Sequence, residues 1–137
     1  MDFVIEKAGA LLLQRAMIFL LYKGRSKMPI CRADDVNAEP VVFLTPWRVF
    51  RLEDGSRHLC GGAGFLGGRV SSAVMSIDHE NATVVTRSGR IYVLVGEPGL
   101  DADADDLWEE WTAFNNVVSW KDVTEEVWSE IQVRQQP

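Results

Sequence analysis

The residues of this chain best suited to metal or thiol chemistry are its two cysteines and two histidines. Thiolate sulfur and imidazole nitrogen are ligands that zinc prefers, but the ligands of a closed zinc site usually come in tight pairs such as CxxC or HxxxH. No such pair occurs here, and His58 and Cys60 would only share one face of a predicted strand. Neighbours at that spacing rarely hold sulfur in line with imidazole, as an activated thiolate needs. We therefore expect no metal and no catalytic residue among Cys31, His58, Cys60 and His79.

A glycine-rich run, Gly62–Gly67, matches the pattern GxGxxG. In a dinucleotide-binding fold this loop follows a strand and opens a helix, so that the phosphates sit at the helix N-terminus. Residues 68–74 have the character of a strand, which favours a flexible β connection and no cofactor. A phosphate cradle formed by the Gly61–Gly68 loop remains the alternative.

Three arginines could supply a positive charge near that loop. Arg87 and Arg90 flank a predicted two-residue turn at Ser88-Gly89, and like charges opposite each other repel unless something neutralises them. With Arg69 on the preceding strand, they could form an anion site. This would make the chain a small anion- or nucleotide-binding protein or enzyme. The alternative is that these arginines are solvated or paired with acidic residues of the same chain.

The spacing Asp101-x-Asp103-x-Asp105 resembles the start of a calcium-binding loop. Such a loop needs glycine at its sixth position and glutamate at its twelfth, where this chain has Asp106 and Thr112. We therefore interpret these acids as the start of a helix, whose dipole favours negative charge there.

The C-terminal part of the chain is far more acidic than the rest. Residues 97–137 hold eleven acidic residues against Lys121 and Arg134, a net charge of −9, whereas residues 1–96 carry +3. An acidic helical face attracts basic protein surfaces, while the overall charge of −6 argues against direct binding to nucleic acid or to an anionic membrane. A solubilising face over a tryptophan core is the alternative. The residues expected to bind a partner are Asp103, Asp105, Asp106, Glu109 and Glu110, with Trp108 or Trp111 as the anchor where exposed.

The N-terminal residues 1–24 have the pattern of an apolar helix. The polar residues of Phe3–Tyr22, which include Lys7 and Gln14, fall on one narrow stripe at 100° per residue. This pattern predicts a helix buried on most sides, with a possible homodimer through residues 3–22, and neither a membrane segment nor a signal peptide.

Residues 41–96 consist of short β-branched and aromatic runs separated by turns, which predicts an antiparallel β-meander curled into a small barrel or a strongly bent sheet. The absence of a βαβ pattern argues against parallel strands. Residues 101–134 predict two acidic helices, the first from Ala104 to Phe114 and the second from Asp122. The predicted class is therefore α+β in a single domain, residues 1–137. Strands are expected at Ile30–Arg32, Val41–Leu44, Trp47–Leu52, Arg57–Cys60, Arg69–Asp78 and Ala82–Thr86, followed by a strand from Ile91.

Several segments resemble a group of small uncharacterised proteobacterial proteins often carried on phages or other mobile elements. The resemblance covers roughly residues 41–125 and implies no activity, so no site residue follows from it. It does imply an accessory protein of a mobile element. The segments are Arg57–Gly61, Gly68–Val74, Thr86–Tyr92, Gly96–Gly99 and Asp103–Trp108.

Charge and resemblance together predict a small cytoplasmic interaction protein rather than an enzyme. It would be a mobile-element inhibitor, similar to an anti-CRISPR or anti-defence protein, whose acidic face covers a basic, nucleic-acid-binding surface of a host protein. The low cysteine content is typical of a reducing compartment.

Overall fold

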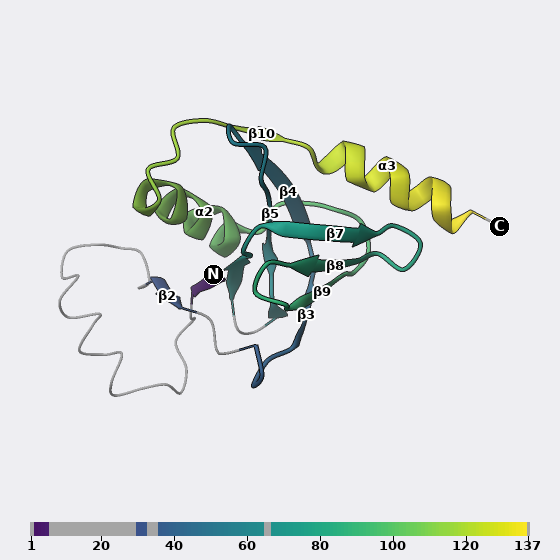
Figure 1. Cartoon of the computed structure of the whole chain (residues 1–137), viewed down its shortest axis with the longest axis horizontal. Helices are drawn as coiled ribbons and strands as arrows, with labels where there is room; N and C mark the ends of the chain where they lie inside the picture. The colour runs from purple at the N-terminus through teal and green to yellow at the C-terminus, as the bar shows by residue number, and fades with distance from the viewer. Residues whose placement is uncertain (1, 6–29, 33–35, 65–66, 137) are drawn as a thin grey trace.

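The computed structural model describes residues 2–5, 30–32, 36–64 and 67–136, which form two β-sheets and two helices (Figure 1). The helices are α2 (Ala102–Phe114) and α3 (Thr124–Gln135). In the order in which they pair, the first sheet contains β10 (Trp120–Asp122), β4 (Trp47–Leu52), β5 (Arg57–Gly62), β6 (Gly68–Val70), β1 (Phe3–Ile5) and β2 (Ile30–Arg32). The second contains β3 (Val41–Leu44), β9 (Ile91–Leu94), β8 (Thr83–Thr86) and β7 (Val74–Asp78).

The first sheet has a hydrophobic cluster on each of its faces, because side chains alternate along its strands. In β4, Trp47 and Val49 face the second sheet and α3, whereas Phe50 faces α2. The cluster between the sheets also contains Tyr92 from β9 and Ile131 from α3. The cluster under α2 contains Phe50, Cys60, Val70, Ala104, Leu107, Trp108 and Trp111.

The outer face of the second sheet is apolar and exposed. Val41 and Phe43 of β3, Val85 of β8 and Ile91 of β9 lie on it, and Met75 lies at the irregular register of β7. The inner residues of the same strands, among them Val42, Val84 and Tyr92, are buried in the core.

The predicted N-terminal helix is wrong where the structure describes it. Phe3–Ile5 form a strand that pairs with β2 on one side and β6 on the other. Phe-Val-Ile suits a strand as well as a helix, and pairing on both sides provides hydrogen bonds that helical periodicity cannot indicate. The rest of the predicted helix, residues 6–24, lies outside the described residues, as does most of the predicted dimer segment 3–22.

The single antiparallel meander is also wrong, because the chain changes sheet twice within the predicted meander, residues 41–96. It passes from the second sheet to the first between β3 and β4, and back again after β6, within the stretch predicted as one strand, Arg69–Asp78. As a result, β3 pairs with β9 in parallel, Val41 opposite Ile91. The sequence contains no helical crossover to indicate this parallel pair, because the connection between β3 and β9 runs through the other strands.

The predicted register of the β8–β9 hairpin is wrong by one residue. Val85 lies opposite Ile91 rather than Tyr92, and the N–H of Thr86 donates to the carbonyl of Arg90 at 3.1 Å. The loop is therefore three residues long and ends at Gly89, whose φ of +88° suits glycine. This register turns Arg90 and Tyr92 into the protein, where both are buried.

Glycines allow α2 to lie directly on the first sheet. A Cβ atom on Gly68 would lie 2.5 Å from the backbone nitrogen of Ala104, in the first turn of α2. Gly61 makes a similar close contact elsewhere: a Cβ atom there would lie 2.6 Å from the carbonyl oxygen of Pro46, just before β4. These glycines serve close packing of backbone against backbone, the structural role for which a strand glycine is suited.

The C-terminal elements differ in detail from the prediction. Asp101 caps α2 by accepting from the N–H of Ala104 at 2.9 Å. Between the helices lies β10, which the sequence analysis missed and which pairs with β4. The second helix starts later than the predicted Asp122: α3 begins at Thr124, Val123 is its N-cap, and Asp122 accepts from the N–H of Thr124. Within the described residues, no helix has the length and apolar character needed to cross a membrane.

Candidate functional site

The two tryptophans predicted as partner anchors belong to the core. Trp108 and Trp111 of α2 are 4% and 6% exposed, and their rings stack with centroids 5.2 Å apart. Trp108 also stacks on Phe50 at 4.4 Å. The more exposed tryptophan is Trp120 on the edge strand β10, at 43%, which meets Trp108 edge-on. Residues 101–134 were predicted to be helical, without an edge strand, so the exposure of Trp120 was not predicted.

The acidic residues predicted on α2 are spread around the helix. Asp106 and Glu109 are exposed, whereas Asp103, Asp105 and Glu110 are partly buried. Asp105 points toward β4, where its carboxylate lies 3.5 Å from the guanidinium of Arg48. These five acids therefore do not form one continuous exposed face.

A different concentration of negative charge lies around Arg48. Nη2 of Arg48 is 2.7 Å from Oδ2 of Asp122, and Nη1 is the atom that meets Asp105. Glu125, in the first turn of α3, is exposed and has no ion pair within the described residues. Two carboxylates, from α2 and β10, thus contact a single guanidinium. Glu125 of α3 lines the same groove as Arg48 and Asp122.

A groove of about 480 Å³ opens at this point. We call it the acidic groove. Its apolar side includes Leu100, which is 71% exposed, and its charged side includes Asp122 and Glu125. The complete lining is Arg48, Pro98, Gly99, Leu100, Asp122, Thr124 and Glu125.

The pKa values of the two aspartates reflect their surroundings. Burial, together with the nearby charges of Asp101 and Asp106, raises the pKa of Asp105 against the opposing effect of Arg48. Burial would also raise the pKa of Asp122, but hydrogen bonds from Arg48 and Thr124 outweigh it and lower the value.

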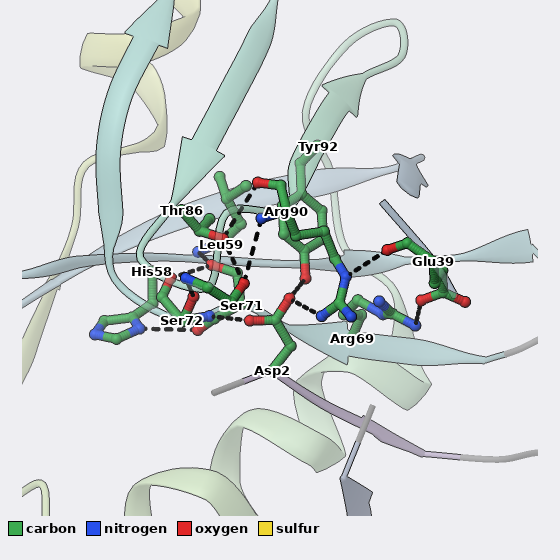
Figure 2. A network of polar contacts seen from close by, with 11 residues as sticks. Asp2, Glu39, His58, Leu59, Arg69, Ser71, Ser72, Thr86, Arg90 and Tyr92 are labelled. Atoms are coloured by element: carbon green, nitrogen blue, oxygen red, sulfur yellow. Dashed lines mark hydrogen bonds and ion pairs between the residues drawn. The ribbon is translucent and has the colours of Figure 1, made fainter. Parts of the chain in front are cut away.

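The three arginines of the alternative anion site are not equivalent. Arg87 is exposed, whereas Arg69 and Arg90 are buried in one polar network (Figure 2). Arg69 Nη2 lies 2.5 Å from Oε1 of Glu39, and Arg90 Nε donates to the carbonyl of Glu39 at 2.8 Å. The two buried guanidiniums are thus engaged with groups of this chain.

The centre of this network is Asp2, which the sequence analysis missed entirely. Its side chain is fully buried, and its carboxylate accepts from Arg90 Nη1 at 2.5 Å, from the N–H of Ser72 at 2.7 Å and from the hydroxyl of Tyr92. Figure 2 shows the three donors converging on the one carboxylate. Burial alone would raise the pKa of Asp2, but these hydrogen bonds outweigh it and lower the value. Burial and the charge of Asp2 raise the pKa of Tyr92, so the phenol stays protonated and donates.

His58 and Cys60 do not form a nucleophile pair. Nδ1 of His58 lies 2.9 Å from the carbonyl oxygen of Ser71, its Nε2 lies 3.2 Å from Oγ of Ser56, and its ring packs on Trp111. Cys60 donates to the carbonyl of Ala104, and burial raises its pKa, so the thiol is protonated. The part of the chain that the structure describes contains no group of three or more His, Cys, Asp and Glu side chains able to hold a metal ion.

Burial of His58 makes stability dependent on pH. Burial lowers its pKa below the usual 6.5, so the unfolded chain takes up a proton at a higher pH than the folded protein does. We expect the free energy of unfolding to fall by up to about 1.4 kcal/mol per pH unit as the pH drops below 6.5. Urea denaturation at pH 7.5, 6.5 and 5.5 would measure this.

His58→Gln should remove most of this dependence, whereas the matched control His79→Gln should retain it. If the two variants show the same pH dependence, His58 is not the group responsible.

Comparison of the chain with protein-family models, curated proteins and solved structures found no match.

Proposed function

We propose that this protein is a protein-interaction module whose acidic groove binds a basic side chain of a partner protein. The observation that carries the proposal is the excess of carboxylate at this point: Asp105 and Asp122 both contact the one guanidinium of Arg48, and the exposed Glu125 lines the groove beside Asp122. An incoming lysine or arginine would meet Glu125 and Asp122 while its aliphatic stem packs on Leu100.

The combination of charge and exposed apolar surface distinguishes this groove from a merely solubilising face. Leu100 lies in the lining itself, so a side chain bound in the groove would bury apolar surface next to the charged groups. Glu126 and Glu130, farther along α3, differ from Glu125 because each is already paired with a basic side chain. The carboxylate of Glu126 lies 3.8 Å from Lys121, and that of Glu130 lies 3.9 Å from Arg134.

The partner class proposed here is a protein with a basic, nucleic-acid-binding surface, such as a host defence protein that a mobile-element inhibitor would block. Such surfaces are rich in the lysine and arginine that the groove would bind. We place this interaction in the cytoplasm, where a free, buried thiol such as that of Cys60 is common.

The proposal can be tested by NMR titration with a basic peptide, acetyl-Gly-Arg-Lys-Arg-Gly-amide. We expect the amide signals of Leu100, Asp122 and Glu125 to shift together and saturate, with weaker binding at 300 mM than at 50 mM salt. Glu125→Lys should weaken binding at least tenfold.

The matched control is Glu80→Lys, which makes the same charge change in the β7–β8 turn and should bind as tightly as the unaltered chain. Shifts spread evenly over all acidic residues, or equal losses in both variants, would show non-specific attraction and contradict the proposal.

A further inference from the structure

The carboxylate of Asp2 occupies a preformed set of hydrogen-bond donors. We call Arg90 Nη1, the hydroxyl of Tyr92 and the N–H of Ser72 the carboxylate pocket. All three groups donate, and all three come from residues 70 to 90 positions away in the chain. A cluster of donors inside a protein suits an anion and disfavours a neutral or positive group.

The backbone after Asp2 lies on a strand edge. Phe3 pairs with Val70 and Val4 with Arg69, so β1 adds to β6 in the way that an extended peptide adds to an exposed sheet edge. Only these two residue pairs join β1 to β6. Residues 2–5 thus have the form of a bound peptide, with a carboxylate in a pocket at one end and a short ladder to β6, while β2 pairs with the other side of β1.

The charges around the pocket also require an acid. Arg69 and Arg90 are both buried, Arg69 against the carboxylate of Glu39 and Arg90 against that of Asp2. Within the described residues, Nε and Nη1 of Arg69 are buried without a hydrogen-bond acceptor. Loss of Asp2 would remove a buried carboxylate that lies 2.5 Å from Arg90, which is unfavourable for a buried guanidinium.

We propose that the carboxylate pocket and the adjoining edge of β6 form a recognition site for an extended peptide that begins with aspartate and continues with apolar residues. Residues 2–5, Asp-Phe-Val-Ile, fill the site in cis, and a segment of the same chemistry from another protein fills it when they leave. This site is separate from the acidic groove and does not depend on the function proposed for it.

The first test asks whether the pocket binds a free carboxylate in the full chain. Asp2→Ala removes only the carboxylate group, and formate restores a group of that size. We expect formate to raise the Tm of Asp2→Ala by several degrees relative to chloride at equal ionic strength, and to leave the unaltered chain unchanged because its pocket is filled. Glu80→Ala, which loses an exposed carboxylate, is the matched control and should not respond. A folded Asp2→Ala variant whose Tm ignores formate would overturn the proposal.

The second test asks whether the site binds a peptide. In the full chain, Asp2→Ala/Val4→Pro weakens the binding of residues 2–5 in two ways. It removes the carboxylate from the pocket, and proline at position 4 cannot donate to the ladder. Fluorescence polarisation would measure binding of labelled acetyl-Asp-Phe-Val-Ile-amide and of its Asn analogue. We expect the aspartate peptide to bind at least tenfold more tightly to the variant, and neither peptide to bind the unaltered chain.

Equal affinity for the two peptides would show that only the apolar strand is recognised, and it would overturn the proposed role of the pocket. If the double variant does not fold, the formate experiment on Asp2→Ala decides the matter.

Discussion

Replacing Arg90 with methionine is expected to lower the free energy of unfolding by about 3 kcal/mol at pH 7. The guanidinium lies 2.5 Å from the fully buried carboxylate of Asp2, and methionine keeps much of the side-chain volume but none of the charge. Among the described residues, Tyr92 and Ser72 would then be the remaining hydrogen-bond donors to the buried carboxylate. Urea denaturation followed by tryptophan fluorescence would measure the change.

The pH dependence gives this prediction a second readout with a definite sign. In the unaltered chain the pKa of Asp2 lies below 3.8, so its contribution is complete above that pH and is lost as the pH falls through the folded pKa. Arg90→Met removes a hydrogen bond and a charge that lower the pKa of Asp2, so this pKa rises in the direction that burial favours. Protonation on going from pH 7 to 4 should then recover part of the lost stability.

The matched control is the double variant Asp2→Asn/Arg90→Met, which removes both charges. It should be more stable than Arg90→Met alone at pH 7 and should lack the recovery at low pH. A loss below about 0.5 kcal/mol for Arg90→Met would mean that the pair behaves like an exposed ion pair, contrary to its burial.

Replacing Gly68 with alanine is expected to cost about 3 kcal/mol, because the added Cβ would lie 2.5 Å from the nitrogen and 2.6 Å from the Cα of Ala104. Both are backbone atoms of the first turn of α2, so no side-chain rotation can relieve the contact. The helix must move away from β6, which would loosen Leu107 and Trp108 in the cluster beneath it. The midpoint of urea denaturation and the fluorescence of the tryptophans on α2 should both change.

Gly64 supplies the control for this substitution. A Cβ atom there meets nothing within 4 Å, and its φ of +65° makes alanine cost only about 1 kcal/mol. Equal losses for Gly64→Ala and Gly68→Ala would indicate that glycine matters for backbone freedom and that the close approach of α2 is unimportant.

The local elements of this fold were more predictable than their arrangement. The strands Val41–Leu44 and Trp47–Leu52 are confirmed at their predicted bounds, because β-branched and aromatic residues alternate there between turn residues. The pairing of β3 with β9 could not be predicted in the same way, since it depends on contacts between residues about fifty positions apart. A single extra loop residue, Arg87, was enough to reverse which side of β9 is buried.

The functional residues likewise divide into features visible in the sequence and features that depend on tertiary contacts. The excess of negative charge near the C-terminus is visible in the composition, but its convergence on Arg48 requires β10, which has only three residues. Asp2 could not be found, because the helical pattern assigned to residues 1–24 placed it at a helix start and left no partner for it. The available signal was the run Phe-Val-Ile directly after an acid, which suits a strand as well as a helix.

The distance along the chain between Asp2 and its partners has a consequence for how the protein is made. Asp2 leaves the ribosome 88 residues ahead of Arg90 and 90 residues ahead of Tyr92. The strand β6 ends at Val70 and therefore emerges before them, so the carboxylate pocket is the last part of the site to be completed. Until Arg90 and Tyr92 emerge, Asp2 lacks two of its three hydrogen-bond donors, at a stage when nascent chains are prone to aggregate and accessible to chaperones.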